Sequence, residues 1–163
     1  MNSIRPWILA ARPKTLFATL APIIVGISLS YKISNTIDWC LTSLIILSAV
    51  LLQIGSNYAN DAYDYLKGAD SQSRKGPKRM VQDGVLSANT VLNVMYIIFT
   101  LSVLIGYFLV KIGGWPIIVI GLSSIIFAII YTGGPYPLAY NGLGETTVFI
   151  FFGIIATVGT VYL

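Results

Sequence analysis

Apolar residues along the chain fall into five long runs separated by short polar stretches. The runs cover approximately residues 16–31, 40–57, 91–110, 115–131 and 146–163. Each is close to the roughly 20 residues that an α-helix needs to cross the ~30 Å hydrocarbon core of a bilayer. In lipid every backbone polar group must be bonded within its own segment, which favours helix even where β-branched residues are frequent. The pattern predicts an all-α membrane protein, with one transmembrane domain over residues 1–163 built as a multi-helix bundle.

Composition narrows the classes of function further. Hydrophobic residues make up 56% of the chain and charged residues only 10%, against about 25% in a soluble domain. The net charge of +4 does not indicate nucleic-acid binding, because the basic residues flank apolar runs. With no histidine and only Cys40, the sequence excludes histidine acid–base chemistry, histidine-ligated zinc and an internal disulfide.

The distribution of lysine and arginine predicts an orientation. Three basic residues precede the first run and five lie between residues 67 and 79, whereas only Lys32 and Lys111 lie in the alternate connections. The positive-inside rule therefore places the N-terminus and the 67–79 loop in the cytoplasm of a multi-pass protein of the cell membrane. The first run lacks a convincing cleavage site, so we expect a retained span and not a signal peptide.

An acidic segment begins where the second run is expected to leave the membrane. Asn57, Asp61 and Asp64 are spaced by four and three residues, and Asn60 lies four before Asp64, so all are expected on one side of a helix. Asp70 follows a helix-ending glycine and can turn back toward them. Carboxylates this close repel one another unless a cation neutralises them, and hard oxygen ligands suit Mg²⁺. We expect Asp61, Asp64 and Asp70 to hold Mg²⁺ as catalytic residues, with Asn57 and Asn60 in support.

A basic segment follows directly. Arg74, Lys78 and Arg79 are candidate contacts for the oxygens of a diphosphate that shares the metal. The plainer alternative is a positive-inside anchor together with ordinary ion pairs, such as Asp64 with Lys67.

The connection between the fourth and fifth runs, residues 131–145, is rich in glycine, proline and tyrosine. Its tyrosines, Tyr131, Tyr136 and Tyr140, are candidates for stacking on an aromatic substrate or for stabilising a cation through their π faces. The alternative is a tight connector with interfacial tyrosines, followed by Glu145 at the next helix N-terminus.

These segments carry a resemblance to a known family. Asn60-Asp61-x-x-Asp64 followed by Gly68-x-Asp70 resembles the first aspartate-rich motif of the UbiA-type intramembrane prenyltransferase superfamily. The longer runs through residues 70–84 and 131–145 are most similar to the branch that prenylates 1,4-dihydroxy-2-naphthoate. The resemblance extends over nearly the whole chain, including residues 12–16 at the entry to the first run.

The resemblance implies a nine-helix fold, of which about five spans are present, with a cavity open to the lipid. It implies two aspartate-rich motifs that bind Mg²⁺ and diphosphate. The implied reaction transfers a polyprenyl chain from polyprenyl diphosphate to 1,4-dihydroxy-2-naphthoate with loss of the carboxyl group, which gives demethylmenaquinone.

Three features depart from the wider family. No aspartate follows Asp83, so the second motif would lie beyond Leu163, and we expect the 163 residues alone to be inactive and poorly stable. The spacing from Asp64 to Asp70 is longer than in the relatives that use 4-hydroxybenzoate, which favours the naphthoate branch. Tyr140 and Asn141 stand where those relatives carry a lysine.

Two other functions remain as alternatives. One is a UbiA-type enzyme with a different aromatic acceptor, which exchanging the acceptor in an assay would reveal. The other is a transporter that uses the acidic segment as a cation site, which predicts ion flux without any dependence on prenyl diphosphate.

Overall fold

The computed structural model describes residues 4–69 and 79–163, and within these ranges all regular structure is helical. The all-α fold class is thereby confirmed. The elements in chain order are α1 (Arg5–Ala11), α2 (Pro13–Ser34), α3 (Trp39–Leu66), α4 (Ala88–Gly113), α5 (Trp115–Ile130), η1 (Leu138–Tyr140), α6 (Gly144–Val148), the π-helical η2 (Phe149–Ile155) and α7 (Ala156–Tyr162).

Four of these helical stretches are long and apolar enough to cross a membrane. They are α2, α3, α4 and the continuous stretch Gly144–Tyr162, which joins α6, η2 and α7; α5 is apolar but shorter, at 16 residues. Helix α3 continues beyond the apolar run, which ends near residue 57, to Leu66, so the whole segment from Asn57 to Asp64 is helical, as the spacing of its polar residues predicted.

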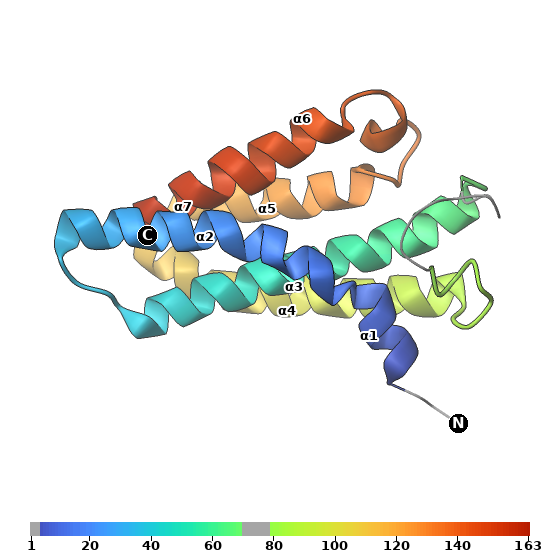
Figure 1. Ribbon diagram of the computed structural model, residues 1–163, viewed down its shortest axis with the longest axis horizontal. Coiled ribbons are helices and arrows are strands. Elements are labelled where there is room, and N and C mark those ends of the chain that lie inside the picture. Colours follow the sequence, from blue (N-terminus) through green and yellow to red (C-terminus); the bar gives the residue numbers. More distant parts are fainter. Residues whose placement is uncertain (1–3, 70–78) are drawn as a thin grey trace.

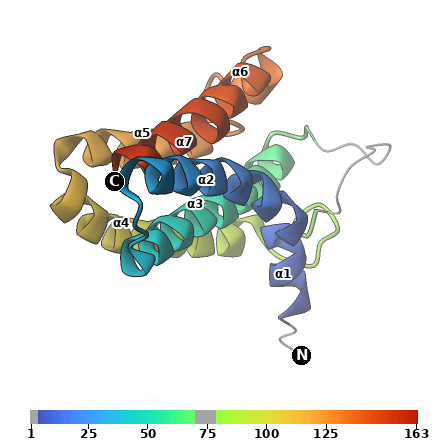
Figure 2. The same ribbon diagram turned by 60° about the vertical axis from the view of Figure 1, so that its left-hand side comes forward.

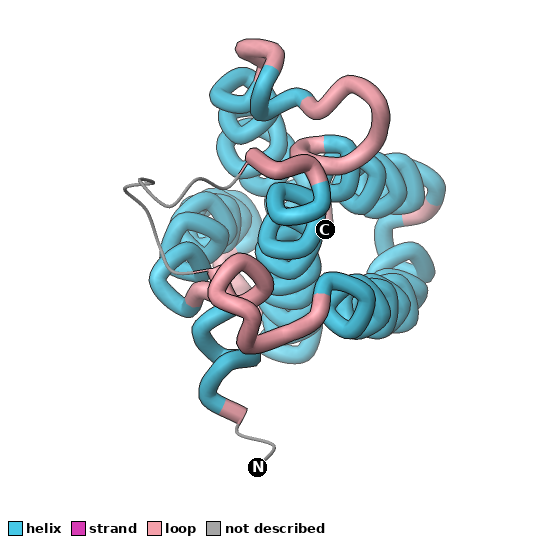
Figure 3. Tube along the Cα trace, turned by 90° about the vertical axis from the view of Figure 1, so that its right-hand side faces the viewer, coloured by secondary structure: helices cyan, strands magenta, loops and turns pink. Residues whose placement is uncertain are grey.

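The long helices lie side by side with α3 in a central position (Figures 1 and 2). Helix α3 packs against α1, α2, α4 and α5, while α2 also packs against α7. The C-terminal turns of α3, helix α1 and the connection 131–143 meet at one end of the bundle, which we call the loop end (Figures 1 and 3). The opposite end carries the α2–α3 connection and Gly114.

Local signals explain where the helices begin and turn. The side chain of Asp38 accepts a hydrogen bond from the Leu41 backbone N–H at 2.9 Å, which caps α3. Between α1 and α2, Arg12 adopts φ 51°, and its backbone N–H donates to the Leu9 carbonyl. Pro13 then opens α2, a position in which its missing N–H costs nothing. The chain therefore bends sharply at Arg12, directly beside α3.

Small residues bring the helices close, as is usual in membranes. A Cβ atom on Gly55 would lie 2.4 Å from the ring of Phe99, so α3 and α4 meet there only because residue 55 has no side chain. Gly26 permits the same approach of α2 to Thr160 of α7, where an added Cβ would lie 2.6 Å from the threonine. This packing fixes α3 against the helices on either side of it.

A cavity of about 610 Å³ lies among the helices and is lined by residues of all five spans. Its wall is mainly aliphatic and aromatic, including Phe127 and Phe151, whose ring centroids are 4.7 Å apart. Polar side chains of α2 and α3, including Thr15, Gln53 and Asn60, line part of it.

Candidate functional site

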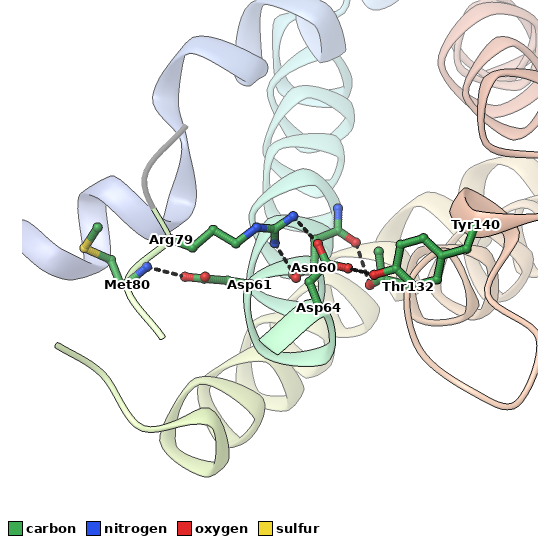
Figure 4. A network of polar contacts seen from close by, with 7 residues as sticks. All are labelled: Asn60, Asp61, Asp64, Arg79, Met80, Thr132 and Tyr140. Atoms are coloured by element: carbon green, nitrogen blue, oxygen red, sulfur yellow. Dashed lines mark hydrogen bonds and ion pairs between the residues drawn. The ribbon is translucent and has the colours of Figure 1, made fainter. Parts of the chain in front are cut away.

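Asp64 lies at the centre of the polar contacts at the loop end (Figure 4). Its carboxylate is 4% exposed; one oxygen accepts a hydrogen bond from the Tyr140 hydroxyl and the other forms an ion pair with the Arg79 guanidinium. These partners come from residues far apart in the sequence, since Arg79 precedes α4 and Tyr140 ends η1. The last turns of α3 thus hold together both segments that were expected to contact substrate.

Arg79 is itself buried, and it also donates a hydrogen bond to the backbone carbonyl of Asn60. A buried carboxylate–guanidinium pair is stable only while both partners are present and their remaining groups are bonded. The ion pair with Arg79 differs from the Asp64–Lys67 pair considered from the sequence, because the Lys67 ammonium donates instead to the Gly134 carbonyl.

Asn60 connects Asp64 to the cavity. Its side-chain oxygen accepts a hydrogen bond of 2.9 Å from the Thr132 hydroxyl, and Asn60 lines the cavity together with Tyr131. Asn60 and Asp64 therefore form one face of α3, directed toward the connection 131–143, and of the two Asn60 lines the cavity. We call these two residues and their partners the Asp64 face.

Asp61 points in another direction (Figure 4). It is 1% exposed, and its Oδ2 accepts the backbone N–H of Met80 at 3.1 Å. The guanidinium groups of Arg12 and Arg79 lie close enough to attract its charge. Asp61 is not among the residues that line the cavity.

Asn57 lies one turn before Asp61 and holds the bend at Arg12 against α3. Its side-chain N–H groups donate to the Ala11 carbonyl at 2.8 Å and to the Thr15 hydroxyl oxygen at 2.9 Å. Its side-chain oxygen accepts from the Gln53 amide at 3.3 Å. Asn57 and Asp61, with these partners, form what we call the Asp61 face.

The remaining predicted site residues divide into three groups. Tyr131 lines the cavity and Tyr140 contacts Asp64, as described above. Tyr136 is 61% exposed at the surface. Asp70, Arg74 and Lys78 lie outside the described residues.

The structure adds residues that the sequence analysis did not select. Thr132 is buried beside Asn60, and its hydroxyl belongs to the same connection that supplied the candidate tyrosines. Gln53 joins Asn57 and Thr15. A polar residue in an apolar span, four positions before Asn57, is a signal that could have identified Gln53.

The donor chemistry at Asp64 fits a hard divalent cation only in part. Within residues 4–69 and 79–163, no group of three or more acidic, histidine or cysteine side chains gathers as a metal site. Mg²⁺ is usually held by one or two carboxylates together with substrate phosphates, and Asp64 with the Asn60 amide oxygen provides ligands of that kind.

Comparison with known proteins identifies the family. Residues 19–163 match the model of the UbiA prenyltransferase family. The chain is 37% identical over 163 residues to a 1,4-dihydroxy-2-naphthoate octaprenyltransferase of Mycobacterium leprae, an alignment that covers 99% of this chain and 54% of the relative. It is 38% identical over 169 residues to the enzyme of the same name from Escherichia coli, covering 100% of this chain and 54% of the relative.

A more distant relative is the UbiA prenyltransferase domain-containing protein 1 of Dictyostelium discoideum, at 29% identity over 90% of this chain and 46% of the relative. No solved structure shows significant similarity to the chain. The chain spans about half the length of the curated relatives that it matches.

Proposed function

Because the chain belongs to the UbiA prenyltransferase family and is a multi-pass membrane protein, we propose that it takes part in prenyl transfer from a polyprenyl diphosphate to 1,4-dihydroxy-2-naphthoate. The aromatic ring would gain the prenyl chain with release of diphosphate and lose its carboxyl group as CO₂, giving the hydroquinone form of demethylmenaquinone. The observation that carries the proposal is the Asp64 face, where a buried carboxylate with cationic and hydroxyl partners lies one helical turn from Asn60, which lines an apolar cavity. The printed names of the relatives support the choice of acceptor.

The cavity suits the prenyl chain. Its volume of about 610 Å³ lies within the range of roughly 300–1,000 Å³ typical of small-molecule sites. Its mainly apolar wall would bury the isoprenoid carbons and exclude water, which would otherwise capture an allylic cation. Tyr131 lines the same cavity, and its π face would stabilise positive charge on the reacting carbon.

We propose that Asp64 and Asp70, with the Asn60 amide oxygen, would hold Mg²⁺. When bound, the metal would neutralise the diphosphate and so make it a better leaving group. Arg79, which already lies beside Asp64, would donate hydrogen bonds to diphosphate oxygens, with Arg74 and Lys78 as further contacts. The Tyr140 hydroxyl would keep the Asp64 carboxylate in place.

We further propose that the loop end faces the cytoplasm of the cell membrane. The basic residues of the N-terminus and of the 67–79 loop support this orientation. Cys40, the single cysteine, is exposed in the first turn of α3, at the opposite end of the bundle.

Cys40 makes the orientation testable. A membrane-impermeant maleimide should label Cys40 in intact cells, whereas a Cys40→Ser, Val85→Cys variant should be labelled only after the cells are broken. Val85 serves as the reporter because it is exposed at the loop end. The reverse pattern of labelling contradicts the proposed orientation.

The reaction itself is tested in lipid nanodiscs with 1,4-dihydroxy-2-naphthoate, a polyprenyl diphosphate and Mg²⁺, with EDTA as control. Two proteins are compared: the 163-residue chain, and the same chain extended by the C-terminal half of the Mycobacterium leprae relative. We expect EDTA-sensitive product from the extended chain and none from the shorter one.

Product with 4-hydroxybenzoate but not with the naphthoate would contradict the acceptor assignment. Absence of product with every acceptor, in an extended chain shown to be folded, would contradict the enzyme proposal.

A further inference from the structure

We propose that Asp61 is a positioning residue: it holds the segment Arg79–Leu86 against α3 so that Arg79 faces Asp64, instead of binding the metal itself. This inference rests on the proposed role of Asp64 in holding a metal–diphosphate pair. It gives the two neighbouring aspartates of one short motif different tasks.

The surroundings of Asp61 are those of a structural carboxylate. It is almost completely buried, and its Oδ2 is engaged by a backbone N–H, whereas the Asp64 carboxylate meets the side chains of Arg79 and Tyr140. Burying a carboxylate costs free energy unless hydrogen bonds and opposite charges compensate. The Met80 N–H and the nearby charges of Arg12 and Arg79 supply that compensation.

The Met80 N–H belongs to a compact turn that is held together by its own backbone hydrogen bonds. The Met80 carbonyl accepts the N–H groups of Val85 and Leu86, both at 3.0 Å, and the Arg79 carbonyl accepts that of Asp83 at 3.0 Å. Met80 and Val81 are buried in the same apolar cluster as residues of α3. Backbone N–H groups of this compact segment, led by that of Met80, therefore bond Asp61 and fix the register of the segment on the helix.

Met80 is the immediate neighbour of Arg79. Displacement of the Met80 N–H from Asp61 would move the Arg79 backbone, and with it the guanidinium that pairs with Asp64 and the Asn60 carbonyl. Asp61 thus acts on the site through Arg79. If Asp61 acts through Arg79, loss of the Asp61 contact should affect the site only while Arg79 is present. A general contribution to folding would not depend on Arg79 in this way.

The test uses Mn²⁺ with inorganic diphosphate as the probe and the protein in nanodiscs. Binding is followed by the electron paramagnetic resonance of Mn²⁺, and hydrogen exchange is followed at the Met80–Leu86 amides. Asp61→Asn keeps an oxygen that can accept the Met80 N–H, whereas Asp61→Leu removes it. Asp64→Asn is the matched control in the same helix.

We expect Asp61→Leu to speed exchange of the Met80 amide by about tenfold, the usual effect of losing one hydrogen bond to a charged group. Asp61→Asn should restore protection and keep affinity for Mn²⁺–diphosphate within about threefold. Asp61→Leu should weaken that affinity in the wild-type background but not further in an Arg79→Met background, because the effect passes through Arg79.

Loss of Mn²⁺ binding in Asp61→Asn to the extent seen in Asp64→Asn would overturn the proposal and make Asp61 a ligand. If Asp61→Leu weakens the affinity for Mn²⁺–diphosphate equally in the wild-type and Arg79→Met backgrounds, the proposal is overturned as well. If the wild-type protein binds no Mn²⁺–diphosphate, the proposed function fails for this chain, while the Met80 exchange and its rescue by asparagine still decide whether Asp61 holds the segment.

Discussion

The two polar faces at the end of α3 differ in what surrounds them. The Asp64 face includes Asn60, which lines the cavity, and it meets Thr132 and Tyr140 of the connection 131–143 and Arg79 of the segment before α4. The Asp61 face meets two backbone groups, the Ala11 carbonyl and the Met80 N–H, and the side chains of Thr15 and Gln53, which also line the cavity. One face presents side chains to a site, and the other fastens chain segments to a helix.

This difference shows that acidic residues in one motif need not share one task. At about 100° per residue, Asp64 lies roughly 40° from Asn60 and 60° from Asp61, so the residues occupy one side of the helix. Asn60 and Asp61, however, lie about 100° apart, at opposite edges of that side. Different neighbours reach the two edges, and these neighbours set the role of each residue.

The largest expected effect on stability comes from breaking the ion pair of the Asp64 face. Arg79→Met should lower the free energy of unfolding by about 3 kcal/mol, because it leaves the Asp64 carboxylate buried without its cation. Unfolding in a denaturing detergent series measures the change. The double variant Asp64→Leu, Arg79→Met should recover most of the loss, and a double variant as unstable as the single one would contradict this reason.

A smaller loss is expected from the Asp61 face. Asn57→Leu should destabilise the protein by about 2 kcal/mol, since it removes the donor to the Ala11 carbonyl and the acceptor of one hydrogen bond from the Gln53 amide. Affinity for Mn²⁺–diphosphate, measured on the folded protein, should change less than threefold. Asn93→Leu, at an exposed position of α4, is the control and should stay within about 0.5 kcal/mol of wild type.

A strong loss of Mn²⁺–diphosphate affinity in Asn57→Leu, without loss of stability, would remove the distinction between the two faces.

The smallest expected effect concerns Tyr140. Tyr140→Phe removes the hydroxyl that orients Asp64 and should weaken Mn²⁺–diphosphate binding by about tenfold, the effect of one hydrogen bond to a charged group. Stability should hardly change, because Tyr140 is about half exposed. Tyr136→Phe, at a more exposed position of the same connection, should behave as wild type. Equal effects of the two substitutions would mean that the Tyr140 contact has no role in binding.

The helical fold could be predicted from the sequence because lipid leaves the backbone few alternatives. Five apolar runs were enough to indicate five helical stretches. The spacing of Asn57, Asp61 and Asp64 indicated that the helix continues beyond the apolar run, and α3 does continue to Leu66. Loss of apolar character marked a change of surroundings and not the end of the helix.

The candidate site could be predicted only in part. The spacing of Asn60 and Asp64 indicated a shared face, and the structure brings Tyr140 of the tyrosine-rich connection to Asp64, while its role toward a substrate stays a prediction. Nothing in the sequence indicated that Arg79 would pair with Asp64 or that Met80 would donate to Asp61. Both contacts depend on how residues 79–86 fold back onto α3, which is long-range packing without a local pattern.

The most direct test of the central claim compares prenyl transfer by Asp61→Asn and Asp64→Asn side by side, in the chain extended by the C-terminal half of the Mycobacterium leprae relative. Removing one preorganised charge at a reacting diphosphate typically costs about 10²–10³ in rate. We therefore predict that Asp64→Asn loses at least about 100-fold in kcat and that Asp61→Asn, which keeps the Met80 contact, loses no more than about tenfold. Losses of equal size in the two variants would contradict the division of α3 into the Asp64 face, which takes part in the reaction, and the Asp61 face, which holds neighbouring segments in place.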